Sequence, residues 1–513
     1  MKQKSRRLKI RHKQTRNKRN KRGGNKELIS QSLQNREENL TIILQTYCKN
    51  PDNCLALGHY GDYIKRFFND FRTFAYVNPS KIKRIGNPSV NGFIIEIPFT
   101  KNGYTAYTVL KSSAKQTADN LFFEYLVGKR FVNKVNKIVP VFLETYDLYQ
   151  YKDDASYDAV VNAVNTNTLP SIDLGAMLQR MNFNPENMNS KQLSIAASNS
   201  CTRNKHLCIL IQHFDNFVSL GSQFKSQELY KEFRGDLFSV LFQVYFALNM
   251  FKDVYTHYDL HTNNVMLYKP FEGKKCILMR YHLADKVYEF KTEYIPKIID
   301  YGRNYFDDSI LNSGKNTLNS YQFIKNICYA PKCNPECGKN FGYRFIRGSE
   351  AIDVDDMLEE EVEEYLESIS WLDPTEPNES HDLRLAAIIF DKLSINNKKV
   401  DILYRGNYGT PYEPSRYGDD KIRNIMDMFA YLKKGVMPYY NKIGKYTTGW
   451  ETVATLDVYD STPYRPYEFN LLPDTSLNRT VTISASSGDT LTGKKRRLED
   501  TVIDENTNKM AKI

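Results

Sequence analysis

A polar stretch from His257 to Leu267, HYDLHTNNVML, contains the residue types that phosphoryl transfer requires. The carboxylate of Asp259 precedes the amide of Asn264 by five residues in this stretch. A carboxylate can take or orient the proton of an attacking hydroxyl, and an amide oxygen beside it can hold a magnesium ion. The alternative is a loop in which both side chains only cap turns. We therefore expect a catalytic loop in which Asp259 serves the hydroxyl and Asn264 is a metal ligand.

A second carboxylate follows an apolar run. Residues 294–303 read YIPKIIDYGR, so Asp300 lies at the end of an expected strand. Gly302 permits a sharp turn directly after it. This position and order predict that Asp300 is a second magnesium ligand.

A lysine and a glutamate complete the set. Lys111 ends the expected strand 104–111, and Glu124 lies thirteen residues later among the apolar residues of an expected helix. A buried carboxylate is costly without a partner, and Lys111 is the natural one. The alternative for Lys111 is a solvated lysine at a strand end.

Several apolar patterns would position these residues. Leu237, Val240, Leu241, Val244 and Leu248 repeat at helical spacing directly before the catalytic loop. Alternating patterns predict strands over 82–85, 93–99, 104–111, 138–149 and 207–214, with Asn102-Gly103 as a hairpin turn. A further strand pair is expected at 276–283 and 286–291, and helices at 380–393 and 420–434.

These motifs together resemble the protein-kinase-like superfamily. The loop at Asp259 is similar to H-R-D-x-K-x-x-N, Asp300-Tyr301-Gly302 is similar to D-F-G, and the strand ending at Lys111 is similar to V-A-I-K. The D-L-H and I-I-D-Y-G-R sequences and a Lys/Arg-rich leader also resemble serine/threonine kinases of nucleocytoplasmic large DNA viruses, the giant viruses. The resemblance implies an α+β, bilobal protein-kinase-like fold, with a small antiparallel sheet lobe and a mainly helical large lobe. It also implies ATP and Mg²⁺ as cofactors, transfer of the γ-phosphoryl group to a Ser/Thr hydroxyl of a protein substrate, and a Lys111–Glu124 bridge that orients ATP.

The resemblance places further residues near the nucleotide. Gly86 and Gly92 lie where kinases carry a glycine-rich loop over the phosphates, although they are six residues apart and Pro88 lies between them. An ordinary turn is the alternative for this loop. The fifth strand ends at residues 212–214 in the connection between the lobes, so the backbone of Gln212, His213 and Phe214 is expected to face the adenine.

The catalytic loop departs from the kinase pattern at two positions. Tyr258 replaces the arginine, and His261 replaces the lysine that approaches the transferring phosphate. His261 can donate a hydrogen bond to that phosphate or pack beneath the loop. Asp382 resembles the aspartate that braces the catalytic loop in kinases, and an ordinary acidic residue at a helix start is its alternative.

Charge and composition separate the chain into parts. Residues 1–26 hold 13 Lys/Arg and no acid, which leaves 58 Lys/Arg and 60 Asp/Glu in the other 487 residues. We expect a disordered basic tail at 1–26, a helical extension at 27–80, a small lobe at 81–215 with a partly disordered insertion at about 153–203, a large lobe with an extended activation region at 216–477, and a disordered polar tail at 478–513. The basic tail would bind nucleic acid or an acidic partner, or would only solubilise the chain.

The remaining features concern location and thiols. No run of 18 apolar residues predicts a membrane span, and the leader lacks the apolar region of a secretory signal. We therefore expect an intracellular protein, in the host cytoplasm or nucleus or in the virion, with free thiols. Cys328, Cys333 and Cys337 lack a visible fourth zinc ligand, so free thiols are favoured over a metal site there.

Two other functions fit the same sequence. D-L-H and the lack of a recognisable A-P-E segment are compatible with a small-molecule kinase of the aminoglycoside or choline type. The sparse glycine loop is compatible with a pseudokinase scaffold that binds partners through its charged tails.

Overall fold

The computed structural model describes residues 44, 48, 50–57, 60–86, 92–116, 118–312, 317–323, 376–393 and 422–472. The basic leader, the polar tail from residue 478, and the cluster of Cys328, Cys333 and Cys337 lie outside the described residues. The expectations for those segments therefore stay predictions.

Six antiparallel strands form the largest sheet. Their order is β1 (Lys83–Ile85), β2 (Gly92–Lys101), β3 (Tyr104–Ser113), β6 (Leu207–His213), β4 (Thr145–Tyr151) and β5 (Leu178–Arg180). The Asn102-Gly103 turn between β2 and β3 is confirmed, and both residues have a positive φ, as a tight hairpin requires. The expected strand at 138–149 is wrong in its first half, since β4 begins at Thr145. Pro140 has no N–H to donate to a sheet, which disfavours a strand through it.

Helices cover this sheet. α4 (Leu121–Val127) begins at Asn120, whose side chain accepts the N–H groups of Phe122 and Phe123, and all seven of its residues are buried. A π-helical turn, η5 (Gly128–Val132), and the short α5 (Asn133–Val135) continue it. Upstream, α2 (Pro51–Ala56) and α3 (Gly61–Phe67) lead into Phe71, which packs against Phe99 of β2 and stacks on the ring of Tyr146 of β4.

Residues 153–203, where we expected partial disorder, contain helices and one short strand. They form α6 (Asp154–Thr166), α7 (Leu174–Met177), β5 and α8 (Ser190–Thr202). α6 buries Tyr157, Val160, Ala163 and Val164 at helical spacing, which supplies the apolar face that the polar composition conceals.

The second half of the chain is built on a buried helix. α10 (Leu237–Met250) follows α9 (Gln227–Phe233) and is buried along most of its length. It packs along α15 (Ile425–Ile443), and α14 (Arg384–Leu393) follows a short helical turn, η10 (His381–Leu383). Two small sheets complete this part, β12 (Ile295–Ile298) with β9 (Val265–Tyr268) and β7 (Val218–Ser219), and β13 (Tyr305–Phe306) with β8 (Tyr255–Thr256).

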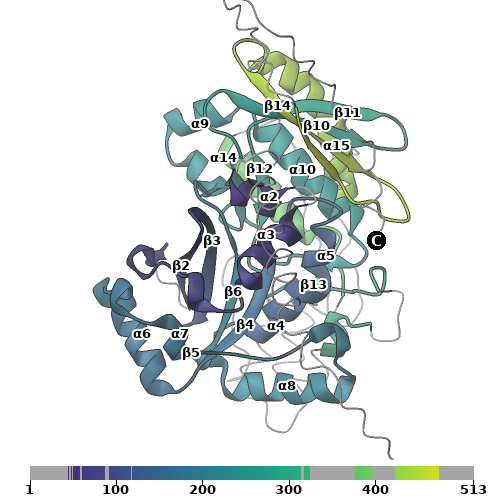
Figure 1. Ribbon diagram of the computed structural model, residues 1–513. Coiled ribbons are helices and arrows are strands. Elements are labelled where there is room, and N and C mark those ends of the chain that lie inside the picture. Colours follow the sequence, from purple (N-terminus) through teal and green to yellow (C-terminus); the bar gives the residue numbers. More distant parts are fainter. Residues whose placement is uncertain are drawn as a thin grey trace, which may run out of the picture. The chain divides into compact units, whose positions relative to one another are not determined.

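A separate four-stranded sheet lies beside α10 and α15 (Figure 1). The expected strand pair is confirmed as β10 (Lys275–His282) and β11 (Val287–Thr292). β14 (Glu451–Tyr459) joins it in parallel to β10, and β15 (Glu468–Leu471) pairs with β14, neither of which we expected. Phe242 and Phe246 of α10 contact Tyr281 of β10 and so attach the helix to this sheet.

The cysteines are not all free. Cys48 and Cys54 form a disulfide at the start of α2, so the expectation of free thiols is wrong for this pair. A separation of six residues lets a turn bring their Cα atoms to 5.2 Å, within the range a disulfide requires. Cys208 and Cys276 are free and buried. No helix within the described ranges combines the length and the apolar character needed to cross a bilayer.

Candidate active site

Lys111 joins three parts of the fold. Its Nζ lies 2.7 Å from Glu124 Oε2 of α4 and 2.7 Å from Asp300 Oδ1, two residues beyond β12. The side chain of Glu124 is almost fully buried, whereas that of Asp300 is 37% exposed. Lys111 therefore satisfies the buried glutamate and still reaches a carboxylate that is open to a ligand.

The charges of this group depend on one another. Burial opposes the charge of Lys111, but Asp300 and Glu124 outweigh it and raise the pKa of Lys111 above its ordinary value. Burial also opposes the charge of Asp300, yet Lys111 holds the pKa of Asp300 below its ordinary value. For Glu124, burial dominates and raises the pKa to about 7 despite the lysine. Lys111 thus stays cationic and Asp300 anionic at neutral pH.

The backbone of the loop from His257 to Asn264, the expected catalytic loop, is held by Asp382. Its two carboxylate oxygens accept the N–H groups of His257 (2.7 Å) and Tyr258 (3.1 Å). Tyr258 has a φ of 61°, a conformation that is uncommon for a residue with a side chain. Asp382 is buried at the helical turn before α14, where it fixes this strained peptide and so positions the next residue, Asp259.

A buried histidine connects the loop to the second carboxylate. His257 donates from Nε2 to Ile299 O (2.9 Å), and its Nδ1 accepts the N–H of Asp259 (3.3 Å). Because Ile299 precedes Asp300, the imidazole ties the two acidic residues to one scaffold.

The expected metal ligands lie at one end of a strand pair. Val265, the first residue of β9, pairs with Ile298, the last residue of β12. Asn264, just before β9, and Asp300, two residues after β12, therefore lie at the same end of this strand pair. Asn264 Nδ2 donates to Asp259 O (2.9 Å), which leaves its Oδ1 as an acceptor. An amide oxygen and an ionised carboxylate are hard oxygen donors that suit Mg²⁺. Within the described ranges, no cluster of three or more His, Cys, Asp or Glu side chains is arranged for a metal.

Arg384 contacts Asp259, and we did not expect it from the sequence. Its Nη1 lies 3.1 Å from Asp259 Oδ1, and both side chains are partly exposed. The residue lies at the start of α14, two positions after Asp382. The only feature of the sequence that could have predicted this contact is that Arg384 lies two residues after Asp382. Because Asp382 contacts the loop, residues next to it in the chain must also lie near the loop.

His261 points one ring nitrogen into its own loop. Its Nδ1 accepts the N–H of Asn263 (3.1 Å), so Nε2 carries the proton. Burial, opposed by Asp259 and reinforced by Arg384, lowers the pKa of His261 below its ordinary value. His261 is therefore a neutral donor at pH 7 and not a cation.

Two ion pairs hold α4 to the segment after Asp300. Arg303 Nε lies 3.4 Å from Asp119, just before the helix. Arg130 Nε lies 2.5 Å from Asp308, and both side chains are buried. The helix that carries Glu124 is thus attached at both ends.

The other residues expected near the nucleotide are Gly86, Gly92, Gln212 and Phe214. Gly86 (φ 69°) and Gly92 flank residues 87–91, which lie outside the described residues. A Cβ on Gly92 would lie 2.3 Å from Ser112 O, so glycine is required there for packing. The N–H of Gln212 donates to Glu144 O (2.8 Å), and the expectation that its backbone faces the adenine stays a prediction. Phe214 is fully buried, with its ring centroid 4.4 Å from that of Tyr268.

Helix α2 packs against the end of β6 and the residues that follow it. Gln212 Nε2 donates to Leu55 O (2.8 Å), and Asp52 accepts the N–H of Asp215 (3.0 Å). Burial raises the pKa of Asp52 to about 7. At the end of the same helix, Lys297 of β12 donates to Ala56 O (3.1 Å). Burial lowers the pKa of Lys297 to about 7. α2 therefore connects the six-stranded sheet to β12.

Comparison with known proteins gives limited similarity. No family model and no curated protein matches the chain. Among solved structures, WaaP in complex with acyl carrier protein aligns over 52% of this chain and 87% of that chain, at 10% identity and a TM-score of 0.22. A crystal structure of a kinase domain aligns over 71% of this chain and 86% of that chain, at 12% identity and a TM-score of 0.23. TM-scores this low do not establish a common fold.

Proposed function

We propose that this chain is an ATP-dependent phosphotransferase with a bilobal protein-kinase-like fold, and that it transfers the γ-phosphoryl group of Mg-ATP to a Ser or Thr hydroxyl of a protein. The observation that carries the proposal is the contact of Lys111 with both Glu124 and Asp300. These three residues come from β3, α4 and the end of β12, and they are the residues that the kinase motifs bring together.

Each charged residue has a distinct role in this mechanism. Lys111 binds ATP phosphate oxygens, and Glu124 keeps the ammonium in place. Asp300 and Asn264 would hold Mg²⁺, which neutralises charge on the phosphates when it is bound. Asp259 accepts a hydrogen bond from the substrate hydroxyl and takes its proton as the new bond forms.

Arg384 supplies the positive charge that the catalytic loop lacks. Kinases place a lysine two residues after the catalytic aspartate, and this chain has His261 there, which is neutral at pH 7. Arg384 reaches Asp259 from α14 instead. In this position it orients the carboxylate and offers a cation to the transferred phosphate. His261 Nε2 is a second, uncharged donor to the same group.

An active enzyme is favoured over a pseudokinase scaffold, because Lys111, Asp259, Asn264 and Asp300 are all present. Ion pairs and hydrogen bonds with neighbouring residues hold them in place. Protein Ser/Thr specificity rests on the sequence resemblance, and a small-molecule kinase remains the competing reaction. Binding of nucleic acid or an acidic partner by residues 1–26, and an intracellular location, are parts of the same proposal.

The test is a radiolabelled-ATP assay of the purified protein with basic proteins, sugars, aminoglycosides and choline as acceptors. Wild type is compared with Asp259→Ala and with Asp253→Ala, an exposed aspartate six residues earlier whose partner is Lys252. We expect transfer to protein in the wild type and Asp253→Ala, and none in Asp259→Ala. Equal rates in all three would exclude the assignment of Asp259.

A further inference from the structure

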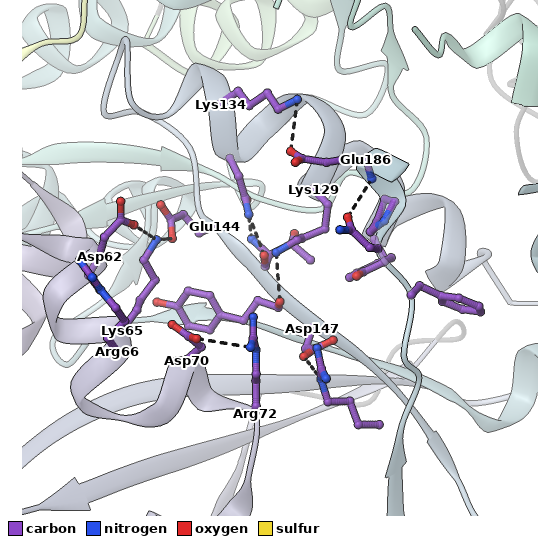
Figure 2. A pocket seen from close by; sticks show the side chains of 18 of the residues that line it. Asp62, Lys65, Arg66, Asp70, Arg72, Lys129, Lys134, Glu144, Asp147 and Glu186 are labelled. Carbon is purple, nitrogen blue, oxygen red and sulfur yellow. Dashed lines mark hydrogen bonds and ion pairs between the residues drawn. The ribbon is translucent and has the colours of Figure 1, made fainter. Parts of the chain in front are cut away.

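A polar cavity lies away from Lys111. Its volume is about 680 Å³, and its walls come from α3, the π-helical turn η5, α5, the start of β4 and residues 180–186 (Figure 2). Cavities of this volume are typical of small-molecule sites. None of the residues assigned to phosphoryl transfer lines it.

The walls are rich in charge. Seven Lys or Arg and five Asp or Glu side chains line the cavity. Most of the cations have a carboxylate partner, as Figure 2 shows for Lys65 between Asp62 and Glu144. Lys134 contacts Glu186 (3.3 Å), and Arg180 contacts Asp147. The cations exceed the carboxylates, so the cavity favours an anion.

Lys129 differs from the other lysines of the cavity. Within the described part of the chain no carboxylate lies within 4 Å of its Nζ, and its hydrogen bond is a long one, 3.4 Å, to Tyr146 O. Burial lowers the pKa of Lys129. A half-buried ammonium with one weak partner is costly, and an anionic ligand would remove that cost.

Other groups around Lys129 could complete an anion site. Arg72 keeps only a 3.7 Å contact with Asp70, and its side chain is 54% exposed. Burial and the nearby Asp147 raise the pKa of Tyr125, another residue of the wall, and the positive charges of Arg180 and Arg72 oppose that rise.

Two hydrogen bonds join α5 to β4 at the wall of the cavity. The side chain of Asn133 donates to Thr145 O (2.8 Å) and accepts the N–H of Thr145 (2.9 Å). This pair fixes the π-helical turn that carries Lys129 against β4. Gly128 is required in that turn, because a Cβ there would overlap the side chain of Thr145. π-helical turns are frequent at functional sites.

We infer that this cavity binds a small phosphomonoester, with its phosphate on Lys129 and flanked by Arg72 and Arg180. A phosphate dianion matches two guanidinium groups and an ammonium with a single long hydrogen bond better than a single carboxylate does, because it offers three acceptor oxygens. The proposal does not depend on phosphotransferase activity.

Calorimetric titration of the full chain with inorganic phosphate tests this site, at constant ionic strength against chloride. Lys129→Met is expected to weaken phosphate binding by about tenfold or more, since it removes a charge-assisted hydrogen bond. Lys252→Met should retain binding, because this lysine does not line the cavity. Lys111→Met is measured alongside it, to detect phosphate held at the candidate active site instead. Glycerol 3-phosphate should bind and glycerol should not.

Three results would overturn the inference: no saturable binding of phosphate, equal binding by wild type and Lys129→Met, or loss of binding in Lys111→Met alone, which would place the phosphate at the candidate active site. Circular dichroism checks that each variant is folded. Should Lys129→Met not fold, the exposed Arg72→Gln is measured instead, and unchanged binding in that variant would also reject the proposed site.

Discussion

The guanidinium of Arg384 and the carboxylate of Asp259 lie 3.1 Å apart although 125 residues separate them in the chain. The contact exists because Asp382, two residues before Arg384, holds the backbone at His257 and Tyr258. One helix start therefore both braces the catalytic loop and brings a cation to its aspartate.

Replacing Arg384 tests whether that cation acts in the reaction. We expect Arg384→Met to lower kcat by about 100-fold, the scale of losing one group that stabilises charge in the transition state. Arg384→Lys should recover part of the rate. The control is Arg423→Ala, an exposed arginine beside α15 that pairs with Asp427. Steady-state rates for the three variants decide the question, and an unchanged kcat in Arg384→Met would limit the residue to a structural role.

Lys111→Met and Asp300→Ala should each abolish phosphoryl transfer while the chain stays folded. They should differ in stability. Lys111→Met leaves Glu124 buried without its cation, which costs about 3 kcal/mol, whereas Asp300 is partly exposed and its loss costs less. Adding Glu124→Gln to Lys111→Met should restore much of the stability and none of the activity. Urea unfolding and the ATP assay measure the two effects, and near-wild-type turnover of either single variant would contradict the site.

Lys297 should make stability depend on pH. Its pKa is lowered to about 7 in the fold by burial, while an unfolded lysine titrates near 10.5. Between these values the unfolded chain binds more protons, so this residue makes stability rise from pH 7 to about 10.5 and adds a constant penalty below pH 7. In Lys297→Met that rise should be absent and the melting temperature at pH 7 higher. Parallel pH slopes for wild type and variant between pH 7 and 10 would contradict the burial of a neutral lysine.

If the proposed function holds, the chain should transfer phosphate without phosphorylation of residues 303–380. Tyr258 occupies the position of an arginine that clamps a phosphorylated residue in many kinases, and its hydroxyl donates instead to Glu376 O (2.6 Å). The Arg303–Asp119 and Arg130–Asp308 pairs already hold α4 to the segment after Asp300. Phosphatase treatment, checked by mass spectrometry, should leave the initial rate unchanged. A large loss that returns on rephosphorylation within 303–380 would show that another cation performs the clamp.

Deleting residues 1–26 should leave phosphorylation of a short peptide unchanged and weaken binding to DNA, RNA or acidic partners. The deletion removes 13 positive charges and few residues that could pack. The binding that is lost should fall steeply with salt. Electrophoretic mobility shifts at several salt concentrations measure it, and loss of peptide phosphorylation on truncation would mean that the leader belongs to the catalytic domain.

The elements that depend on a local pattern could be predicted from the sequence alone. Asn102-Gly103 specified a hairpin, alternation specified β10 and β11, and helical spacing specified α10, because each signal is complete within about fifteen residues. The order of Lys111, Glu124, Asp259 and Asp300 suggested one site through its resemblance to the kinase motifs, and a buried Glu124 needed a cation such as Lys111.

Only the tertiary structure decided the contacts between distant segments that have no matching local signal. β14 pairs in parallel with β10 across about 175 residues, α2 reaches both Gln212 and Lys297, and Arg384 meets Asp259. The cavity at Lys129 could not be predicted either, because its charged residues come from α3, η5 and β4, which are distant in the sequence. Such pairings are selected by the free energy of the whole packed chain, and no short stretch of residues contains that information.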